Sequence, residues 1–192
     1  MPRVSKEPEE RKEEIIEAAR KLFEEKGYEE TMMSDVAQSI GISQGLPYRY
    51  FKSKLELLDA VASKFGTEFL KVVLGLKFKQ GTSAKERLDK YFDTVGSIAE
   101  SRLVSILHKK DNSEVHRRIS ENIFKGLIPQ LRELIEEGNR DGSFDCPYPD
   151  AAADFLIYGA MSIHEKVQMR GVPDTIKVIR QVFYRILGVE QD

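Results

Sequence analysis

The stretch that decides the fold of this chain is residues 33–51, which read MSDVAQSIGISQGLPYRYF. Val36 and Ile40 are spaced so that their apolar side chains share one face of a short helix. Ala37 is small enough for two helices to cross closely, and Gly41 permits the positive φ that a tight turn requires. The stretch therefore predicts two short helices joined at Gly41, in the arrangement of a helix-turn-helix.

We expect the first short helix over residues 33–40 and the second over residues 44–51. Ser43 is placed to cap the second helix, and Pro47 and Tyr50 are placed to form its inward face. Tyr50 is therefore open to interpretation as mainly a core side chain. A short helix that projects from a core in this way fits the width of a DNA major groove.

The rest of the chain is helical by pattern, with no convincing alternation of the strand period. Pairs of Ser and Glu three residues apart, at Ser53 and Ser83, open two of the helices as capping boxes. Further helices are expected over residues 8–26, 54–79, 83–99, 114–139 (interrupted or kinked near Pro129), 150–169 and 173–187.

This pattern predicts an all-α protein of about nine helices. We expect an N-terminal three-helix domain that carries the helix-turn-helix over residues 1–54. A second, larger helical domain is expected over residues 55–192.

The composition favours a globular protein of the cytoplasm. Apolar residues make up 41% of the chain and charged residues 32%. The single cysteine, Cys146, fits a reducing compartment, and the charged N-terminus lacks the apolar core of a signal peptide. No stretch approaches the ~20 apolar residues that span a bilayer, so no membrane partner is expected.

The net charge of −2 argues against a protein that coats nucleic acid. Residues 34–54 nevertheless carry Arg49, Lys52 and Lys54 against Asp35 alone. This local excess predicts a small basic surface at the helix-turn-helix.

From Lys12 to Leu58 the chain resembles the N-terminal domain of the TetR family of transcriptional regulators. The resemblance rests on short phrases, namely Ala19-Arg20-Lys21-Leu22-Phe23, Gly27-Tyr28, Val36-Ala37, Gly41-Ile42-Ser43, Gly45, Tyr48-Arg49-Tyr50-Phe51 and Lys54. It implies a regulator that binds double-stranded operator DNA as a homodimer and responds to a small-molecule effector. The resemblance assigns ligand binding and dimerisation to the helical domain over residues 55–192. The segment Leu131 to Phe144 is similar to the helix that precedes the dimerisation helices in this family.

The resemblance also implies the residues of a DNA interface. Gln44 and Leu46 would face base edges, and Gly45 would let the backbone approach closely. The other implied contacts are to phosphate or, for Arg49, to either base or backbone, and they involve Thr31, Ser34, Ser43, Tyr48, Arg49, Tyr50 and Lys54.

Two departures from the family pattern affect this interface. Met32 stands where the family often has Thr, which removes a hydroxyl from the phosphate contacts. Pro47 replaces an aliphatic residue in the second helix, where we expect it to stiffen the first turn at the loss of at most one hydrogen bond.

The last two predicted helices are apolar on more than one face. Such a helix must be buried on both sides, and in a short chain the second side favours a symmetry mate. The alternative is burial within one protomer. The expected dimer interface is Phe155, Gly159, Ala160, Ile163, Ile179, Val182, Phe183 and Ile186.

The ligand is expected to be apolar or amphipathic, because aromatic and methionine side chains dominate the candidate pocket. Arg102 and His164 are placed to orient a polar end. The candidate lining is Phe69, Tyr91, Phe92, Val95, Arg102, Ile106, Phe124, Leu127, Tyr158, Met161 and His164, most of which have an equally good interpretation as core.

No enzyme, metal or cofactor is expected. The three histidines lack the tight spacing of a zinc site, and no phosphate-binding loop or nucleophile motif is present. Three interpretations stay open: a ligand-responsive repressor, a DNA-binding protein of this fold controlled by a protein partner, and a helical enzyme or binding module that merely carries the motif.

Overall fold

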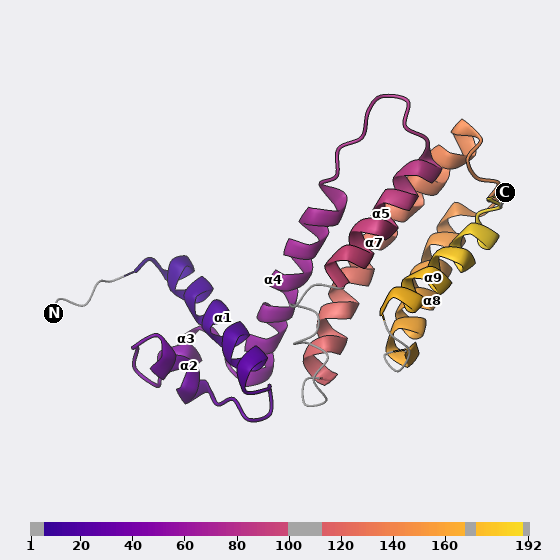
Figure 1. The fold of residues 1–192 in the computed structure, drawn as a ribbon. Coiled ribbons are helices and arrows are strands. Elements are labelled where there is room, and N and C mark those ends of the chain that lie inside the picture. The colour runs from indigo at the N-terminus through magenta and orange to yellow at the C-terminus, as the bar shows by residue number, and fades with distance from the viewer. Residues whose placement is uncertain (1–5, 100–112, 168–171, 190–192) are drawn as a thin grey trace. The chain divides into compact units, whose positions relative to one another are not determined.

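A computed structural model describes residues 6–99, 113–167 and 172–189 (Figure 1). These residues form helices and connecting turns, and the described part contains no strand. They fall into two compact units, one made of residues 6–65 and 113–119 and the other of the remaining described residues. The all-α prediction is confirmed, with eight helices in the described ranges against about nine expected for the whole chain.

The first unit contains α1 (Pro8–Glu25), α2 (Met33–Ser39), α3 (Pro47–Tyr50) and the first half of α4 (Lys54–Leu74). α1 begins at a proline and ends before Gly27, whose φ is 97°. Its buried stripe packs on α2 and α4, and the most deeply buried side chains of this core are Ile15, Phe23, Val36, Leu57 and Leu58.

α3 is shorter than predicted, because it begins at Pro47 rather than at residue 44. The residues before it form a turn in which the Leu46 N–H donates to the Ser43 carbonyl over 2.9 Å. The predicted Ser43 cap is therefore wrong, since Leu46 is the N-cap residue and has no side-chain cap. Proline at the first position of a helix leaves no hydrogen bond unmade.

α4 also ends earlier than predicted, at Leu74 rather than at Lys79. Gly75 follows, and glycine is a weak helix former. The next helix, α5 (Ala84–Ala99), begins as predicted at the Ser83 and Glu86 capping box, in which the Ser83 N–H donates to Glu86 over 2.9 Å.

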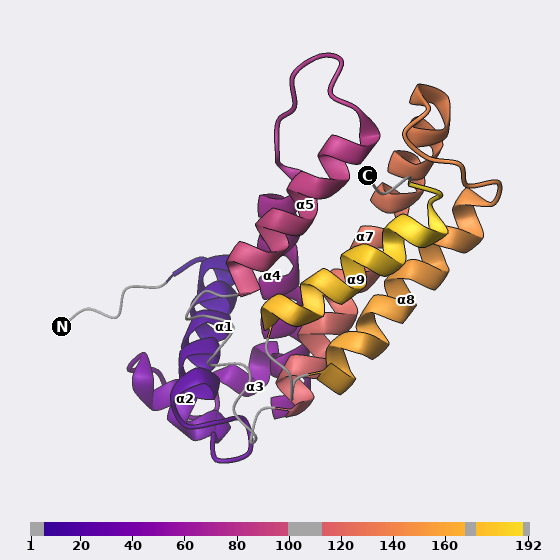
Figure 2. The same cartoon turned by 45° about the vertical axis from the view of Figure 1, so that its right-hand side comes forward.

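The second unit contains α5, most of α7 (Ser113–Asp141), α8 (Pro149–Val167) and α9 (Val172–Ile186). α7 continues through Pro129, so the predicted interruption is not found. α8 and α9 run antiparallel and lie side by side in both views (Figures 1 and 2). α5 packs on α9, where the Phe92 and Phe183 rings meet edge to face with centroids 5.1 Å apart.

The core of this second unit is continuous from α5 to α9. It includes Leu88, Ile135, Leu156 and Leu187, all with at most 4% of their surface exposed. Among the described helices, none combines the length and the apolar character that a membrane span requires.

Candidate nucleic-acid interface

The turn between α2 and α3 has the geometry that the sequence predicted. Gly41 adopts a φ of 67°, and its N–H donates to the Gln38 carbonyl over 3.2 Å. The next N–H, that of Ile42, reaches back to the Ala37 carbonyl over 3.0 Å. Val36 and Ala37 are fully buried, so α2 is held against the core while the chain reverses.

An acidic residue holds the start of α2. The Asp35 carboxylate accepts the Met32 N–H over 3.1 Å and lies 3.4 Å from the Lys26 ammonium. The Met32 backbone hydrogen bond lowers the pKa of Asp35 below its usual value, and Lys26 adds to this effect. The side chain of Met32 offers no oxygen in return, and it lies 62% exposed.

Beyond the turn, several of the predicted DNA-binding side chains face solvent. Ser43, Gln44, Gly45 and Arg49 are exposed, and Tyr48 is 56% exposed. Leu46, Tyr50 and Ser34 are half-buried, while Pro47 is buried as the inward face of α3. The segment from Ser43 to Arg49 thus presents an exposed strip made of Ser43, Gln44, Gly45, Tyr48 and Arg49.

Thr31 does not lie on this exposed strip. Its side chain is fully buried, and its hydroxyl donates to the Gly27 carbonyl over 2.7 Å. The predicted phosphate contact at Thr31 is not available in this arrangement, because the hydroxyl instead holds the end of α1 to the start of α2. This partner is only four residues away in sequence, but the residue types alone do not reveal that the hydroxyl is turned inward.

Lys54 is also turned toward the protein. Its ammonium donates to the Tyr28 carbonyl over 2.9 Å and to the Glu29 carbonyl over 3.2 Å. The same ammonium lies 4.3 Å from the centroid of the Tyr28 ring. The Gly27-Tyr28 pair was part of the resemblance, but the sequence analysis did not predict the contact between Tyr28 and Lys54.

The predicted ligand-pocket residues are largely packed in the second unit. Phe92 belongs to the core, and Tyr91, Phe124 and Leu127 are half-buried against it. Phe69, Val95 and Met161 are half-buried, and Tyr158 is 51% exposed. Arg102 and Ile106 lie outside the described residues, as does the side chain of His164.

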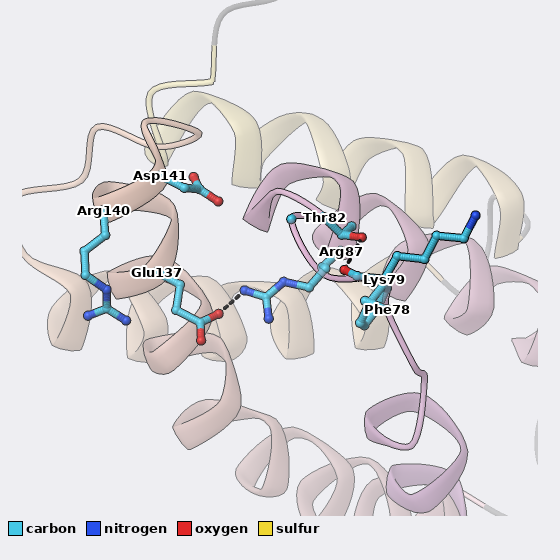
Figure 3. Close-up of a pocket in the computed structure, with 8 residues that line it drawn as sticks. Phe78, Lys79, Thr82, Arg87, Glu137, Arg140 and Asp141 are labelled. Atoms are coloured by element: carbon cyan, nitrogen blue, oxygen red, sulfur yellow. Dashed lines mark hydrogen bonds and ion pairs between the residues drawn. The ribbon is translucent and has the colours of Figure 1, made fainter.

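A groove of about 540 Å³ in the second unit is lined by other residues. The ion pair between Arg87 and Glu137 crosses it (Figure 3). Lys79 and Arg140 point away from this pair in opposite directions, so the cations of the groove do not converge (Figure 3). The carboxylate of Asp141 is engaged by the Ala84 N–H over 2.8 Å. The groove therefore has the character of a polar surface rather than of an apolar ligand site.

The predicted dimer residues divide between two faces of α8 and α9. Ala160, Ile179 and Phe183 are buried in the core of their own unit. Gly159, Ile163 and Ile186 are half-buried. Phe155 is 67% exposed and Val182 38% exposed, and they are joined on the surface by Tyr158 and Val178.

Comparisons with known proteins agree with this geometry. Residues 15–61 match the family model described as bacterial regulatory proteins, tetR family. The fatty acid metabolism regulator protein of Bacillus subtilis is 27% identical over 77% of this chain and 78% of its own length. The transcriptional repressor KstR2 of Mycolicibacterium smegmatis is 27% identical over 82% of this chain and 77% of its own length.

Solved structures share the fold. A TetR-family regulator from Pectobacterium atrosepticum, 19% identical, superposes with a TM-score of 0.75 and covers 95% of this chain and 97% of its own. The fatty acid degradation regulator FadR from Bacillus halodurans, 23% identical, gives a TM-score of 0.64 over 93% of this chain and 96% of its own.

The helix-turn-helix packs its inner face on the core and exposes a polar strip, and the relatives are transcriptional regulators. Together these findings indicate a DNA-binding transcriptional regulator rather than an enzyme. Over residues 15–61 the chain matches the tetR family of bacterial regulatory proteins, and over most of its length it shares the fold of a TetR-family regulator.

The ionised form of Asp35 should contribute to stability only where the carboxyl is charged. Because its pKa is lowered on folding, this contribution is present above the unfolded value near 3.8 and is lost as pH falls through the lower folded value. Asp35→Asn keeps an acceptor for the Met32 N–H but removes the charge. We expect this variant to melt below the wild type at pH 7, with the gap closing as pH falls below about 4.

Thermal unfolding followed by circular dichroism between pH 3 and pH 7 tests this expectation. Glu30→Gln is the matched control, because Glu30 is an exposed acid of the same unit and shows no ion pair within the described residues. A gap that stays constant across the pH range would contradict the role assigned to the Asp35 charge.

Proposed function

We propose that this chain is a repressor that binds a pseudo-palindromic operator as a homodimer and releases it when a small apolar or amphipathic ligand binds. The observation that carries the proposal is the exposed strip from Ser43 to Arg49, held outward by the buried Val36, Ala37 and Pro47. A strip of this kind enters a major groove, where each base pair presents a distinct pattern of donors and acceptors.

Within the strip, Gln44 is assigned to a base edge by hydrogen bond and Leu46 to a thymine methyl group. Gly45 has open space around it, since a Cβ there would meet nothing within 4 Å, and the DNA backbone can approach. Tyr48 and Arg49 are assigned to phosphate, with base contact as the second option for Arg49. Ser34 and Tyr50 are half-buried, so each is assigned a contact with phosphate through its hydroxyl group at the edge of the strip.

The homodimer is assigned to the apolar surface of α8 and α9. Phe155, Tyr158, Val178 and Val182 expose large apolar side chains there, and a Cβ at Gly159 would meet nothing within 4 Å. Such a surface favours a self-complementary contact in which two copies form a four-helix interface. Two recognition helices about 34–36 Å apart then match successive major grooves.

Ligand control is assigned to α4, which supplies residues to both compact units. A ligand that binds one arrangement of the second unit better shifts the position of α4 and the spacing of the two recognition helices. Ligand and operator then weaken each other's binding by the same factor. Two similar proteins are named for fatty acid metabolism or degradation, which makes long-chain fatty acids the first amphipathic compounds to test.

A second candidate is control by a protein partner instead of a small molecule. The observation that favours it is the close packing of the predicted pocket residues, since Phe92 is 8% exposed and its neighbours pack against the same core. Under this alternative the DNA-binding roles are unchanged and only the source of the signal differs.

Selection of bound duplexes from a random pool tests the DNA-binding role. We expect a two-fold symmetric consensus. Gln44→Ala should relax the preference at one position per half-site by about 1–3 kcal/mol, because a base contact is lost. Gln38→Ala is the matched control, because Gln38 is exposed on α2 and lies before the turn. Uniform weakening on all duplexes by Gln44→Ala would contradict its assignment to a base.

The dimer assignment predicts that a charge at its centre separates the protomers. Phe155→Glu should raise the dimer dissociation constant roughly tenfold or more, since a large apolar side chain in an interface core carries much of the binding energy. Val72→Glu, at an equally exposed apolar position on α4, should leave it unchanged. Sedimentation velocity measures both variants, and a wild type that stays monomeric at micromolar concentration would overturn the assignment.

The ligand assignment predicts that a long-chain fatty acid lowers the affinity for the selected duplex. The expected effect is about 5- to 150-fold, the usual range for coupled sites. Fluorescence anisotropy with a labelled duplex measures it, with a short-chain acid as the control. If none of a series of apolar and amphipathic compounds changes the affinity, the protein-partner alternative is favoured.

A further inference from the structure

We propose that Lys54 is a positioning residue, which orients the helix-turn-helix by clamping the loop after α1 to the start of α4, and that it does not act as a phosphate contact. The clamp consists of Lys54, Tyr28 and Glu29. This inference rests on the proposed recognition of an operator by the Ser43–Arg49 strip, and it assigns Lys54 a role that acts through that strip.

The donors of the Lys54 ammonium are mostly used within the protein. An ammonium has three N–H donors, and two of them reach the Tyr28 and Glu29 carbonyls, 2.9 and 3.2 Å away. The face of the Tyr28 ring lies 4.3 Å from the same nitrogen, which adds a cation–π attraction. These three contacts together hold the ammonium against the loop that follows α1.

The position of the charge supports the same role. Lys54 is the first residue of α4, where the helix dipole disfavours a cation. The two carbonyls that accept its hydrogen bonds come just after the C-terminal end of α1. The dipole of α1 favours a cation at that end. The Lys54 ammonium therefore links the loop after α1 to the start of α4, although Lys54 and Tyr28 are 26 residues apart in sequence.

Tyr28 connects the Lys54 ammonium to the start of the helix-turn-helix. Its ring is 9% exposed and meets the Phe23 ring edge to face at 5.3 Å. Its carbonyl accepts the Thr31 N–H over 3.2 Å as well as the ammonium, and Thr31 precedes α2 by two residues. Loss of the clamp should therefore loosen the loop that sets the direction of α2, and with it the angle at which the strip meets DNA.

Lys54→Gln tests the proposal in the full-length dimer on the selected duplex and on a scrambled duplex. Misorientation of the strip predicts that the ratio of the two affinities falls by at least about fivefold, the discrimination of one base contact. The slope of log affinity against log salt should stay unchanged. A lost phosphate contact, or a smaller folded fraction, would lower both affinities equally and keep the ratio.

Two further variants sharpen the test. Lys52→Gln is the matched control, because Lys52 is an exposed neighbour whose ammonium makes no hydrogen bond or ion pair within the described residues. Its removal should leave the ratio unchanged. Tyr28→Leu removes the ring of a buried residue that cannot reach DNA, and it should lower the ratio in the same way as Lys54→Gln. An unchanged ratio in both Lys54→Gln and Tyr28→Leu would overturn the proposal.

Hydrogen exchange of the Thr31 amide provides a readout that needs no DNA. Lys54→Gln should speed this exchange by about tenfold or more, because a charged donor to the same carbonyl is lost. An unchanged exchange rate, or a salt slope that falls by about 0.9, would overturn the clamp. Failure of the wild type to prefer any duplex would instead overturn the proposed operator recognition, while the exchange rate would still decide the clamp.

Discussion

The reversal of the chain at Gly41 is the constraint on which the DNA-binding face depends. Its φ of 67° lies in the left-handed region, where an L-residue with a side chain costs about 1–2 kcal/mol. The Ile42 N–H then reaches the Ala37 carbonyl, and Ala37 itself has no exposed surface. Because α2 is fixed against the core at this point, Ser43, Gln44 and Gly45 directly after the turn lie at the surface. The exposure of Gln44 and Tyr48 follows from this reversal.

Features set by neighbours in sequence could be predicted from the sequence. The start of α1 at Pro8, its stop before Gly27 and the capping box at Ser83 each depend on residues within one or two turns. The resemblance to TetR regulators, which the comparisons confirm, also indicated which residues form the exposed strip. Local rules suffice here because the partners of each backbone group lie a few residues away.

Features set by distant partners could not be predicted in this way. Lys54 has a residue type that suits phosphate, yet the structure turns it toward Tyr28, 26 residues away. Thr31 has a nearby partner in Gly27, but its complete burial depends on the packing of the whole unit. The end of α4 at Leu74 and the start of α3 at Pro47 depend on turn geometry that periodicity does not describe. For α8 and α9 the apolar pattern showed two faces, but only packing shows that Ile179 and Phe183 belong to the inner one.

The contacts of α4 within the first unit constrain how a signal can reach the motif. Besides the Lys54 clamp, the Lys64 ammonium lies 2.6 Å from a Glu13 carboxylate oxygen on α1, and Asp59 pairs with Arg118 on α7. Exposed ion pairs such as these contribute little stability individually. The Lys54 clamp and the Lys64–Glu13 pair together restrict the rotation of α4 relative to α1, and the Asp59–Arg118 pair ties α4 to α7. A displacement of α4 would therefore carry α1 and the loop before α2 with it as one body. In the proposed mechanism the ligand changes the spacing of two intact helix-turn-helix motifs, and it does not need to unfold either of them.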